Sequence, residues 1–255
     1  MSWSQRRKAT YTLSFLSIFI VIFLIIFLLF LSPKKPTCFD GIENGTETGI
    51  DCGGTCVILC RADYAKPSVL WVRWAKVLSS GSYNLLAYGQ NPNIGTGAIH
   101  VPYSYRIYDK NNILLYENSG TAYLPPENNF VVFEDGIKIG DKVPARVDFK
   151  FSTGSIFWQK IPNLELGIKI VSQTLLNVNT RPKLLATLKN ITLKPIQNIQ
   201  SVAILYDENG NAIAFSKTII DSIDKDSTAD IVFTWPEPFH TQVLRTDILS
   251  EVLPQ

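Results

Sequence analysis

The sequence predicts an all-β protein in which two tandem β-sandwiches follow an N-terminal transmembrane helix. Three observations predict this fold class. An uncharged apolar run lies near the start, four cysteines follow it closely, and beyond them apolar and polar residues alternate with period two between Gly, Asn, Pro and Asp turns. The predicted segments are a tail (1–10), the helix (11–32), a cysteine-rich segment (33–61), a first sandwich module (66–161) and a second one (162–255).

The first element is the apolar run over residues 11–31, which consists mostly of Leu, Ile, Phe and Val. At about 1.5 Å per residue, a helix over this run spans roughly 30 Å, the thickness of a bilayer's hydrocarbon core. A cleaved signal peptide is the main alternative, but the run is long for one and no small-x-small cleavage site follows it. A lipoprotein signal and a buried core helix fit less well. We therefore expect a retained single-pass membrane helix.

The orientation of this helix follows from its flanks and from what comes after it. Arg6, Arg7 and Lys8 precede the helix, and Lys34 and Lys35 follow it, so the excess of positive charge on the N-terminal side is small. The short tail cannot fold into a domain, whereas the long C-terminal part can. The cysteines favour an oxidising compartment for that part. We expect the N-terminus in the cytoplasm and the C-terminal domains outside the cell membrane.

The second element is a segment that contains Cys38, Cys52, Cys56 and Cys60. It has almost no apolar residues to form a core, so two disulfides are the leading interpretation. Closing a loop of about fifteen residues contributes on the order of 3 kcal/mol in the chain-entropy model. Four cysteines allow three pairings, and the sequence does not choose among them. A zinc or iron–sulfur site is the rival, although the cysteine spacing is not the usual one for zinc.

Residues 38–56 read Cys-x-Asp-Gly-x-x-Asn-Gly-x-Glu-x-x-x-Asp-Cys-Gly-Gly-x-Cys. This pattern resembles a short cysteine-bounded motif that is scattered through bacterial cell-surface proteins. The resemblance implies a surface location and no particular biochemical role.

The same stretch contains a possible calcium loop. In the window 40–51, Asp40 stands at position 1, Asn44 at 5, a Gly at 6 and Asp51 at 12, as in part of the EF-hand loop. Glu47 offers a further oxygen ligand, whereas Ile42 at position 3 offers none, and no flanking helices are predicted. Two interpretations stay open: an acidic loop held by disulfides, which is the simpler one, or calcium bound by Asp40, Asn44, Glu47 and Asp51.

Beyond residue 61, short segments alternate between apolar and polar residues, and no long run has helical spacing. Predicted strands include 82–87, 101–108, 147–151, 184–188, 202–206 and 230–234. Turn sequences separate them, among them Asp-Lys-Asn-Asn at 109–112 and Asp-Glu-Asn-Gly at 207–210. These segments predict antiparallel sheets.

The two halves of this region align with one another at a shift close to 99 residues, which predicts a duplication. The matching blocks are Leu85-Leu86-Ala87 with Leu184-Leu185-Ala186, Asn91 with Asn190, Ile107-Tyr108-Asp109 with Leu205-Tyr206-Asp207, and Val131-Val132-Phe133 with Ile231-Val232-Phe233.

The second half resembles the FxLYD domain family, which comprises small immunoglobulin-like β-sandwiches found on many bacterial surface proteins. The motifs that carry the resemblance are Ala203-Ile204-Leu205-Tyr206-Asp207, Gly210-Asn211 and Phe233-Thr234-Trp235-Pro236. Ala203 stands where the family has an aromatic residue. In the first half, Asn91-Pro92-Asn93 and Tyr103-x-Tyr105-x-Ile107-Tyr108-Asp109 are similar to this module and to the LEA type 2 sandwich. The resemblance implies two immunoglobulin-like modules and no catalytic residue.

The aromatic residues of the first module could stack on sugars or on a protein. Strand alternation places Tyr103 and Tyr105 on one face and Trp71 and Trp74 on opposite faces, so at least one tryptophan belongs to the core. We therefore favour core packing for most of these side chains.

No residue pattern indicates an enzyme. His100 and His240 lie in different predicted modules without neighbouring nucleophiles, and no Gly-rich phosphate loop precedes a helix. With a net charge of +2 and no basic cluster, the chain is not expected to bind nucleic acid. No cofactor is expected apart from the possible calcium ion.

Taken together, these observations predict a non-enzymatic membrane protein that displays two immunoglobulin-like domains outside a bacterial cell. We expect it to bind a protein or a polysaccharide or to support the cell envelope structurally. The alternative is an accessory subunit of a membrane secretion or pilus-type assembly.

Overall fold

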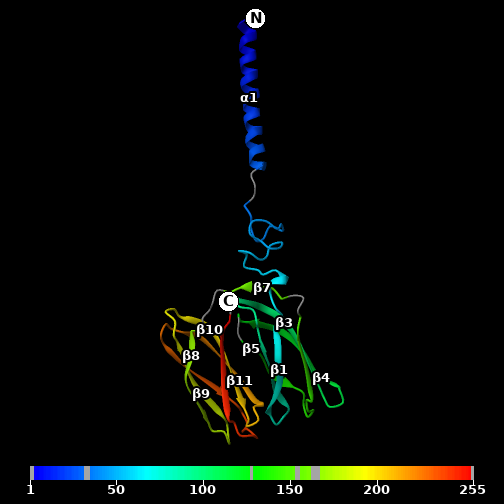
Figure 1. The fold of residues 1–255 in the computed structure, drawn as a ribbon, viewed down its shortest axis with the longest axis vertical. Coiled ribbons are helices and arrows are strands. Elements are labelled where there is room, and N and C mark those ends of the chain that lie inside the picture. Colours follow the sequence, from blue (N-terminus) through cyan, green and yellow to red (C-terminus); the bar gives the residue numbers. More distant parts are fainter. Residues whose placement is uncertain (1–2, 32–34, 127–128, 153–155, 162–166, 254–255) are drawn as a thin grey trace.

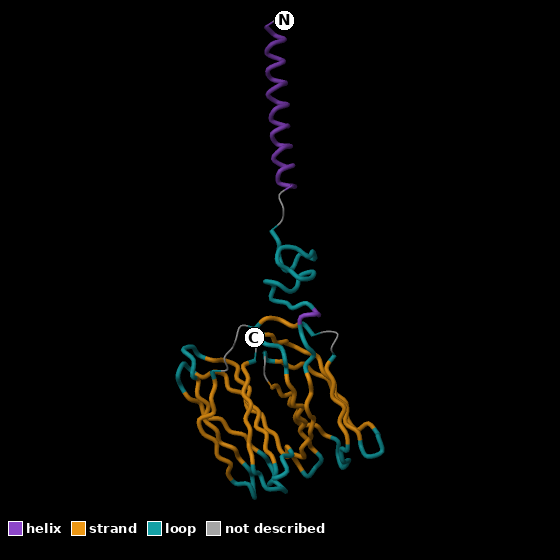
Figure 2. Tube along the Cα trace, in the orientation of Figure 1, coloured by secondary structure: helices purple, strands orange, loops and turns teal. Residues whose placement is uncertain are grey.

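The computed structural model describes residues 3–31, 35–126, 129–152, 156–161 and 167–253. One long helix leads through a small irregular segment to a head of β-strands (Figures 1 and 2). The prediction of an all-β protein with one N-terminal apolar helix is confirmed. The expected flank at 32–34 and the expected start of the second module at 162–166 lie outside the described residues.

The helix, α1, extends over Trp3–Leu31 and so begins earlier than the sequence predicted. Residues 3–10 contain neither Gly nor Pro, so nothing in this stretch interrupts the helix. A single helical turn, η1 (Arg61–Asp63), precedes the head.

Among the described residues, the first module contains seven strands and the second contains six. The strands are β1 (Ser68–Leu78), β2 (Ser82–Gln90), β3 (Thr96–Tyr108), β4 (Leu114–Leu124), β5 (Asn129–Lys138), β6 (Arg146–Phe151) and β7 (Trp158–Lys160), then β8 (Ile168–Leu176), β9 (Lys183–Asn190), β10 (Ile196–Tyr206), β11 (Ala212–Ile223), β12 (Thr228–Thr234) and β13 (Arg245–Val252). The predicted strand segments all fall within β2, β3, β6, β9, β10 and β12.

Each module is an immunoglobulin-like sandwich of two antiparallel sheets. The sheet orders are β1-β2-β5 and β4-β3-β6 in the first module, with β7 added to β3, and β12-β9-β8 and β11-β10-β13 in the second. Alternate residues of each strand face the core between the sheets, as Leu184, Ala186 and Leu188 do on β9. Apart from β7, which has no counterpart among the described strands of the second module, the two modules share one topology.

The strand register shows how the two modules correspond. Ala87 pairs with Val132 in the first module, and Ala186 pairs with Ile231 in the second. Val132, rather than Val131, is thus the counterpart of Ile231, and the alignment of this block from the sequence was off by one residue. Such a slip exchanges the two faces of a strand, so the correct register is needed to compare the modules.

Local hydrogen bonds repeat as well. Asn91 and Asn190 are both buried and donate from Nδ2 to carbonyl groups of the adjoining loops at 2.7–3.1 Å. Asp109 and Asp207 each accept backbone N–H groups two and four residues further on, at 2.8–2.9 Å. These side chains close equivalent turns, so the sequence keeps the same turn chemistry in both modules.

The two modules pack against each other through an apolar interface that we call the seam. The outer face of sheet β1-β2-β5 covers the outer face of sheet β11-β10-β13. Its buried residues are Ala75, Leu86 and Val131 of the first module and Val202, Ile204, Tyr206 and Phe215 of the second. The four sheets are thus stacked, and the seam adds a third apolar layer to the two sandwich cores.

The faces that form the seam differ in chemistry from their counterparts that face solvent. Across the seam face of β1, β2 and β5, one row consists of Trp71, Tyr88 and Val131, with the two rings stacked at 5.0 Å. The equivalent row on the free face of β8, β9 and β12 consists of polar residues joined by hydrogen bonds of 3.1 and 2.7 Å, namely Ser172, Thr187 and Asp230.

Sheets β4-β3-β6 and β11-β10-β13, which are equivalent in the two modules, show the same contrast between a free face and a seam face. On the free face of the first module, Arg106 and Glu117 form an ion pair at 2.8 Å. At the equivalent cross-strand position of the second module, Ile204 pairs with Phe215, and both are buried in the seam. At these equivalent positions the faces that meet are apolar and the free faces are polar, although Leu185 and Val232 are exposed on the free face of the second module.

Leu86 and Leu185 provide a matched test of the seam, because both stand in the middle of a Leu-Leu-Ala block. Leu86 is 0% exposed and Leu185 is 41% exposed. We expect Leu86→Ala to lower the free energy of unfolding by about 2–5 kcal/mol and Leu185→Ala by less than about 1 kcal/mol. Urea unfolding of the detergent-solubilised protein measures both values, and equal losses would contradict the seam.

Candidate functional site

The cysteine-rich residues 36–60, which we call the collar, lie between α1 and the head (Figure 1). Two disulfides hold the collar: Cys38–Cys56 and Cys52–Cys60. The pairing is interleaved, since the second bridge starts inside the loop that the first one closes. None of the four cysteines is free. The disulfide interpretation of the collar therefore fits the structure, and the pairing is one of the three that the sequence allowed.

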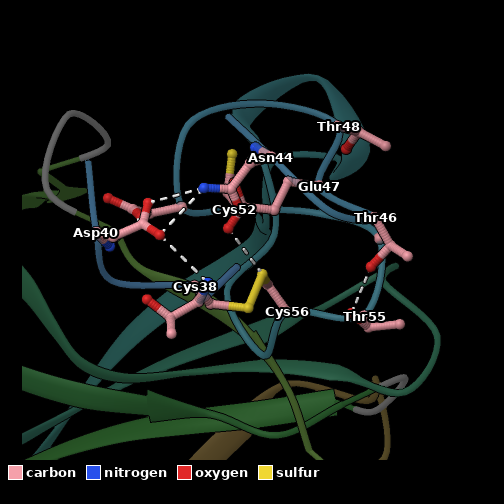
Figure 3. Close-up of a disulfide and its surroundings, with 12 residues drawn as sticks. Cys38, Asp40, Asn44, Thr46, Glu47, Thr48, Cys52, Thr55 and Cys56 are labelled. Atoms are coloured by element: carbon pink, nitrogen blue, oxygen red, sulfur yellow. Dashed lines mark hydrogen bonds between the residues drawn. A yellow bond between two sulfur atoms is a disulfide. The ribbon is translucent and has the colours of Figure 1, made fainter. Parts of the chain in front are cut away.

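The acidic residues of the collar hold its backbone. Asp51 accepts the backbone N–H groups of Asp40 and Gly41 at 2.8–3.0 Å. Asp40 in turn accepts Nδ2 of Asn44 at 3.1 Å (Figure 3), and this bond is the main cause that lowers the pKa of the Asp40 carboxyl. Glu47 accepts the backbone N–H of Asn44 at 3.1 Å. The loop is thus a network of turns closed by carboxylates.

The four residues expected to bind calcium are the ones that form these hydrogen bonds, namely Asp40, Asn44, Glu47 and Asp51. Among the described residues, one group of three potential metal-ligating side chains lies close together, and it consists of Cys38, Glu47 and Cys56 rather than of the three expected carboxylates. The two sulfur atoms belong to a disulfide, so this group offers no thiolate (Figure 3). Oδ1 of Asn44 is buried without a hydrogen-bond partner. Calcium binding by Asp40, Asn44, Glu47 and Asp51 stays a prediction.

The glycines of the collar motif have a steric role. Gly54 has a φ of +52°, and a Cβ added there would lie 1.7 Å from the carbonyl oxygen of Thr46. Gly41 has a φ of +73°, but nothing lies within 4 Å of its added Cβ. Gly54 therefore permits a close approach of two backbone segments, whereas Gly41 serves only the turn conformation.

The collar is attached to the first module through its own backbone. Ile58 forms a β-bridge with Gln159, the N–H of Leu59 donates to Trp158 O at 2.9 Å, and the N–H of Lys160 donates to Val57 O at 2.8 Å. The end of the collar thus extends the sheet next to β7. Leu59 also packs on the first core, so the end of the collar is fixed to the first module.

The aromatic residues that the sequence singled out are mostly internal. Tyr103 and Tyr105 point into the first core, and both donate hydrogen bonds to the carboxylate of Glu134. Burial, followed by this carboxylate, raises the pKa of both phenols. Trp74 packs on the same core and Trp71 on the seam, which confirms that they lie on opposite faces of β1.

Sequence reasoning missed an acidic residue at the seam. Glu251 on β13 is 9% exposed and accepts Nε2 of Gln200 at 2.8 Å. It borders a cavity of about 230 Å³ that residues of both modules line. Burial raises the pKa of Glu251 to about 7, and the bond from Gln200 partly offsets this effect. The charge of Glu251 in turn contributes to the raised pKa of Tyr123 in the first module. In the sequence, Glu251 looked like an ordinary surface carboxylate.

The helix α1 contains one stretch, Arg6–Leu28, that is long and apolar enough to cross a membrane. A signal sequence near an N-terminus meets the same test. His100 and His240, the two histidines considered above, are exposed on different modules.

Gly54 and Gly41 form a matched pair for testing the collar. Both have positive φ, so each change to Ala adds a backbone strain of about 1 kcal/mol or more. Only Gly54→Ala also forces backbone atoms apart. We expect Gly41→Ala to form both disulfides and Gly54→Ala to give mispaired or reduced cysteines, as peptide mapping under non-reducing conditions would show. Native pairing in both variants would contradict the steric argument.

Glu251 predicts a pH dependence of stability. Its ordinary pKa is 4.5 and its folded pKa is about 7, so between these values the folded protein binds more protons than the unfolded chain. The stability contribution of Glu251 therefore falls as the pH rises through this window. We expect Glu251→Gln to be more stable than the unaltered protein by about 2–3 kcal/mol at pH 8, and by much less at pH 4.5. Urea unfolding at both pH values measures this, and a pH-independent difference would contradict it.

Comparisons with known proteins assign no family to this chain. No protein-family model matches the chain, and no curated protein matches it either. Among solved structures, red sea bream transglutaminase is 9% identical over 73% of this chain and 30% of its own, with a TM-score of 0.22. A β-glucuronidase of Bacteroides uniformis is 12% identical over 68% and 26%, with a TM-score of 0.23. This chain spans less than a third of the length of these two proteins.

Proposed function

We propose that this chain is a non-enzymatic protein of the bacterial cell envelope that a membrane helix anchors and that displays its two-module head outside the membrane. One observation carries the proposal: a disulfide-linked collar lies between an apolar helix and the head and is joined to the head by backbone hydrogen bonds. Such an arrangement attaches the head to the membrane through the collar, as a binding or supporting protein requires.

The disulfides support the orientation. Structural disulfides persist in oxidising compartments and are rare in the cytosol. Since the collar and the head follow α1 along the chain, we place them outside and the N-terminal end of α1 in the cytoplasm.

The non-enzymatic role is supported by how the acidic groups are used. Asp40, Asp51, Asp109 and Asp207 accept backbone N–H groups of their own loops. Glu237 accepts the N–H of Ser79 across the two modules at 2.8 Å, which helps to lower its pKa. These carboxylates hold the fold together, and we propose binding of a protein or a polysaccharide as the role of the head.

We further propose that both modules belong to the FxLYD and LEA type 2 class of sandwiches. In the first module Tyr105 fills the aromatic position of the motif. In the second, Ala203 stands there, and Phe233 occupies the place of Glu134 on the neighbouring sheet. The exchange of Tyr105 and Glu134 for Ala203 and Phe233 keeps the core filled, which supports a common origin.

One feature favours the alternative, an accessory subunit of a membrane secretion or pilus-type assembly. Phe15, Phe19, Phe23 and Phe27 recur every four residues along α1, and the rings of the first two lie 5.0 Å apart. Such a ridge could pack into the groove of a partner helix. The two proposals differ in whether an unrelated transmembrane helix can replace α1 without loss of function.

Thiol labelling of intact cells tests the topology. We expect a membrane-impermeant maleimide to label the collar only after a reductant has been added, and to label a Ser4→Cys variant at its N-terminal thiol only after lysis. Ser4 serves as the control because it lies at the N-terminal end of α1, which the proposed topology places across the membrane from the collar. Collar labelling that requires lysis would contradict the orientation, and labelling without a reductant would contradict the disulfides.

A further inference from the structure

One side of the second module is open. Strand β8 lies at the edge of its sheet, and most of its residues are exposed on both faces. Strand β13 is the facing edge of the other sheet. Between them runs a groove, lined by Ile170 and Gln173 of β8 and by Thr246 and Ile248 of β13. Within the described part of the chain, β8 pairs with β9 alone, so its outer edge presents backbone groups that a further strand could bind.

In the first module, aromatic rings close the same side. Phe149 and Phe151 of β6 lie 5.2 Å apart and contact Tyr103 and Phe130 at centroid distances of 5.3 and 5.7 Å. All four rings pack on the first core. The strand register identifies their counterparts in the second module.

The counterparts are small. Tyr103 pairs with Phe151, and the equivalent pair is Ser201 with Ser250, whose hydroxyl groups are 2.8 Å apart. Phe149 corresponds to Ile248. Phe130 pairs with Gly89 in the first module, and the equivalent pair in the second module is Ala229 with Leu188. The large side chain thus stands on the other strand of the pair, so the volume of the Phe130 ring is replaced. Neither member of the serine pair is bulky, so the loss of the ring of Phe151 is not compensated within this pair.

A cavity borders Ile248 and Ser250, the counterparts of Phe149 and Phe151. Its volume is about 230 Å³, and its walls include Ile168, Ile170 and Ser250 of the second module together with Pro125 and Val131 of the first. Small-molecule pockets usually measure about 300–1,000 Å³, so this cavity suits a single side chain better than a whole ligand. It shares Ile170 and Ile248 with the groove between β8 and β13 and opens onto the seam.

We propose that this groove binds an extended peptide strand of a partner protein, which adds to the free edge of β8 and inserts one aromatic side chain into the cavity at Ser250. The free backbone edge calls for a peptide, because it offers alternating donors and acceptors at the spacing of a strand. The first module shows which side chain fits, since Phe151 fills the equivalent place. The inference rests on the proposed role of the head in binding a protein.

Gln173 controls access to the groove. Its Nε2 donates to Thr246 O at 3.3 Å and so bridges β8 and β13. A strand that enters must displace this single exposed hydrogen bond. Thr174 is the neighbouring residue, but it stands opposite Leu185 on the other face of the sheet. The two positions therefore allow a matched comparison.

The test uses the full chain in detergent micelles and two fluorescein-labelled peptides of alternating threonine and valine, one with a central phenylalanine and one with alanine there. We expect the phenylalanine peptide to bind at least about tenfold more tightly, from the burial of one ring. Ser250→Phe should weaken its binding at least about tenfold, because it fills the cavity as Phe151 does. Gln173→Ala should strengthen binding, and Thr174→Phe should leave it unchanged. Fluorescence anisotropy measures all four.

Each other outcome would overturn the inference. One is that the two peptides bind equally tightly, or that neither binds. The others are that Ser250→Phe binds the phenylalanine peptide as tightly as the unaltered protein does, or that Thr174→Phe binds it more weakly. If circular dichroism shows that Ser250→Phe does not fold, the Gln173→Ala variant provides the test instead. Tighter binding of the phenylalanine peptide by this variant supports the inference, and unchanged or weaker binding overturns it. If the protein without peptide has twice the mass of one chain, the groove would be assigned to a second copy of the chain rather than to a partner's strand. The assay does not depend on the membrane orientation, so its failure leaves the thiol-labelling test of the proposed function intact.

Discussion

The apolar seam between the two modules is the contact on which the rest of the structure depends. It turns two small sandwiches, each with limited core, into one stack of four sheets with three apolar layers. Because the collar is fixed to the first module and the seam fixes the second, the open groove has a set position relative to the collar. The seam also buries Glu251, which accounts for the raised pKa of that carboxyl.

The two modules differ in chemistry on the faces that form this seam. A contact between different faces of equivalent modules could in principle repeat without end, as head-to-tail interfaces do. Here the free faces carry charged and hydroxyl side chains, Arg106 with Glu117 on one and Thr187 with Asp230 on the other, where the seam has apolar ones. These polar groups distinguish the free faces from the two faces that meet at the seam. The second module also has Ser201 and Ser250 where the first has Tyr103 and Phe151, and one of its sides is open.

Much of the fold could be predicted from the sequence, since period-two patterns identified the strands and the cysteines identified the collar. The seam could not, because Leu86 and Leu185 stand in identical Leu-Leu-Ala blocks and only one is covered. One sequence feature does indicate the seam. Residues 202–206 form a continuous apolar run, which is typical of a strand buried on both faces. The disulfide pairing and the register of β12 needed coordinates, because spacing alone admits several solutions.

Hydrogen exchange of the whole chain tests the central claim, that the seam makes the two modules one cooperative unit. The most protected amides of β2 in the first module and of β10 in the second report on the opening of each. If the seam joins the modules, both sets exchange through the same global unfolding, with equal free energies that fall together as denaturant is added. If one module opens at a lower free energy while the other stays closed, the modules are independent and the account is wrong.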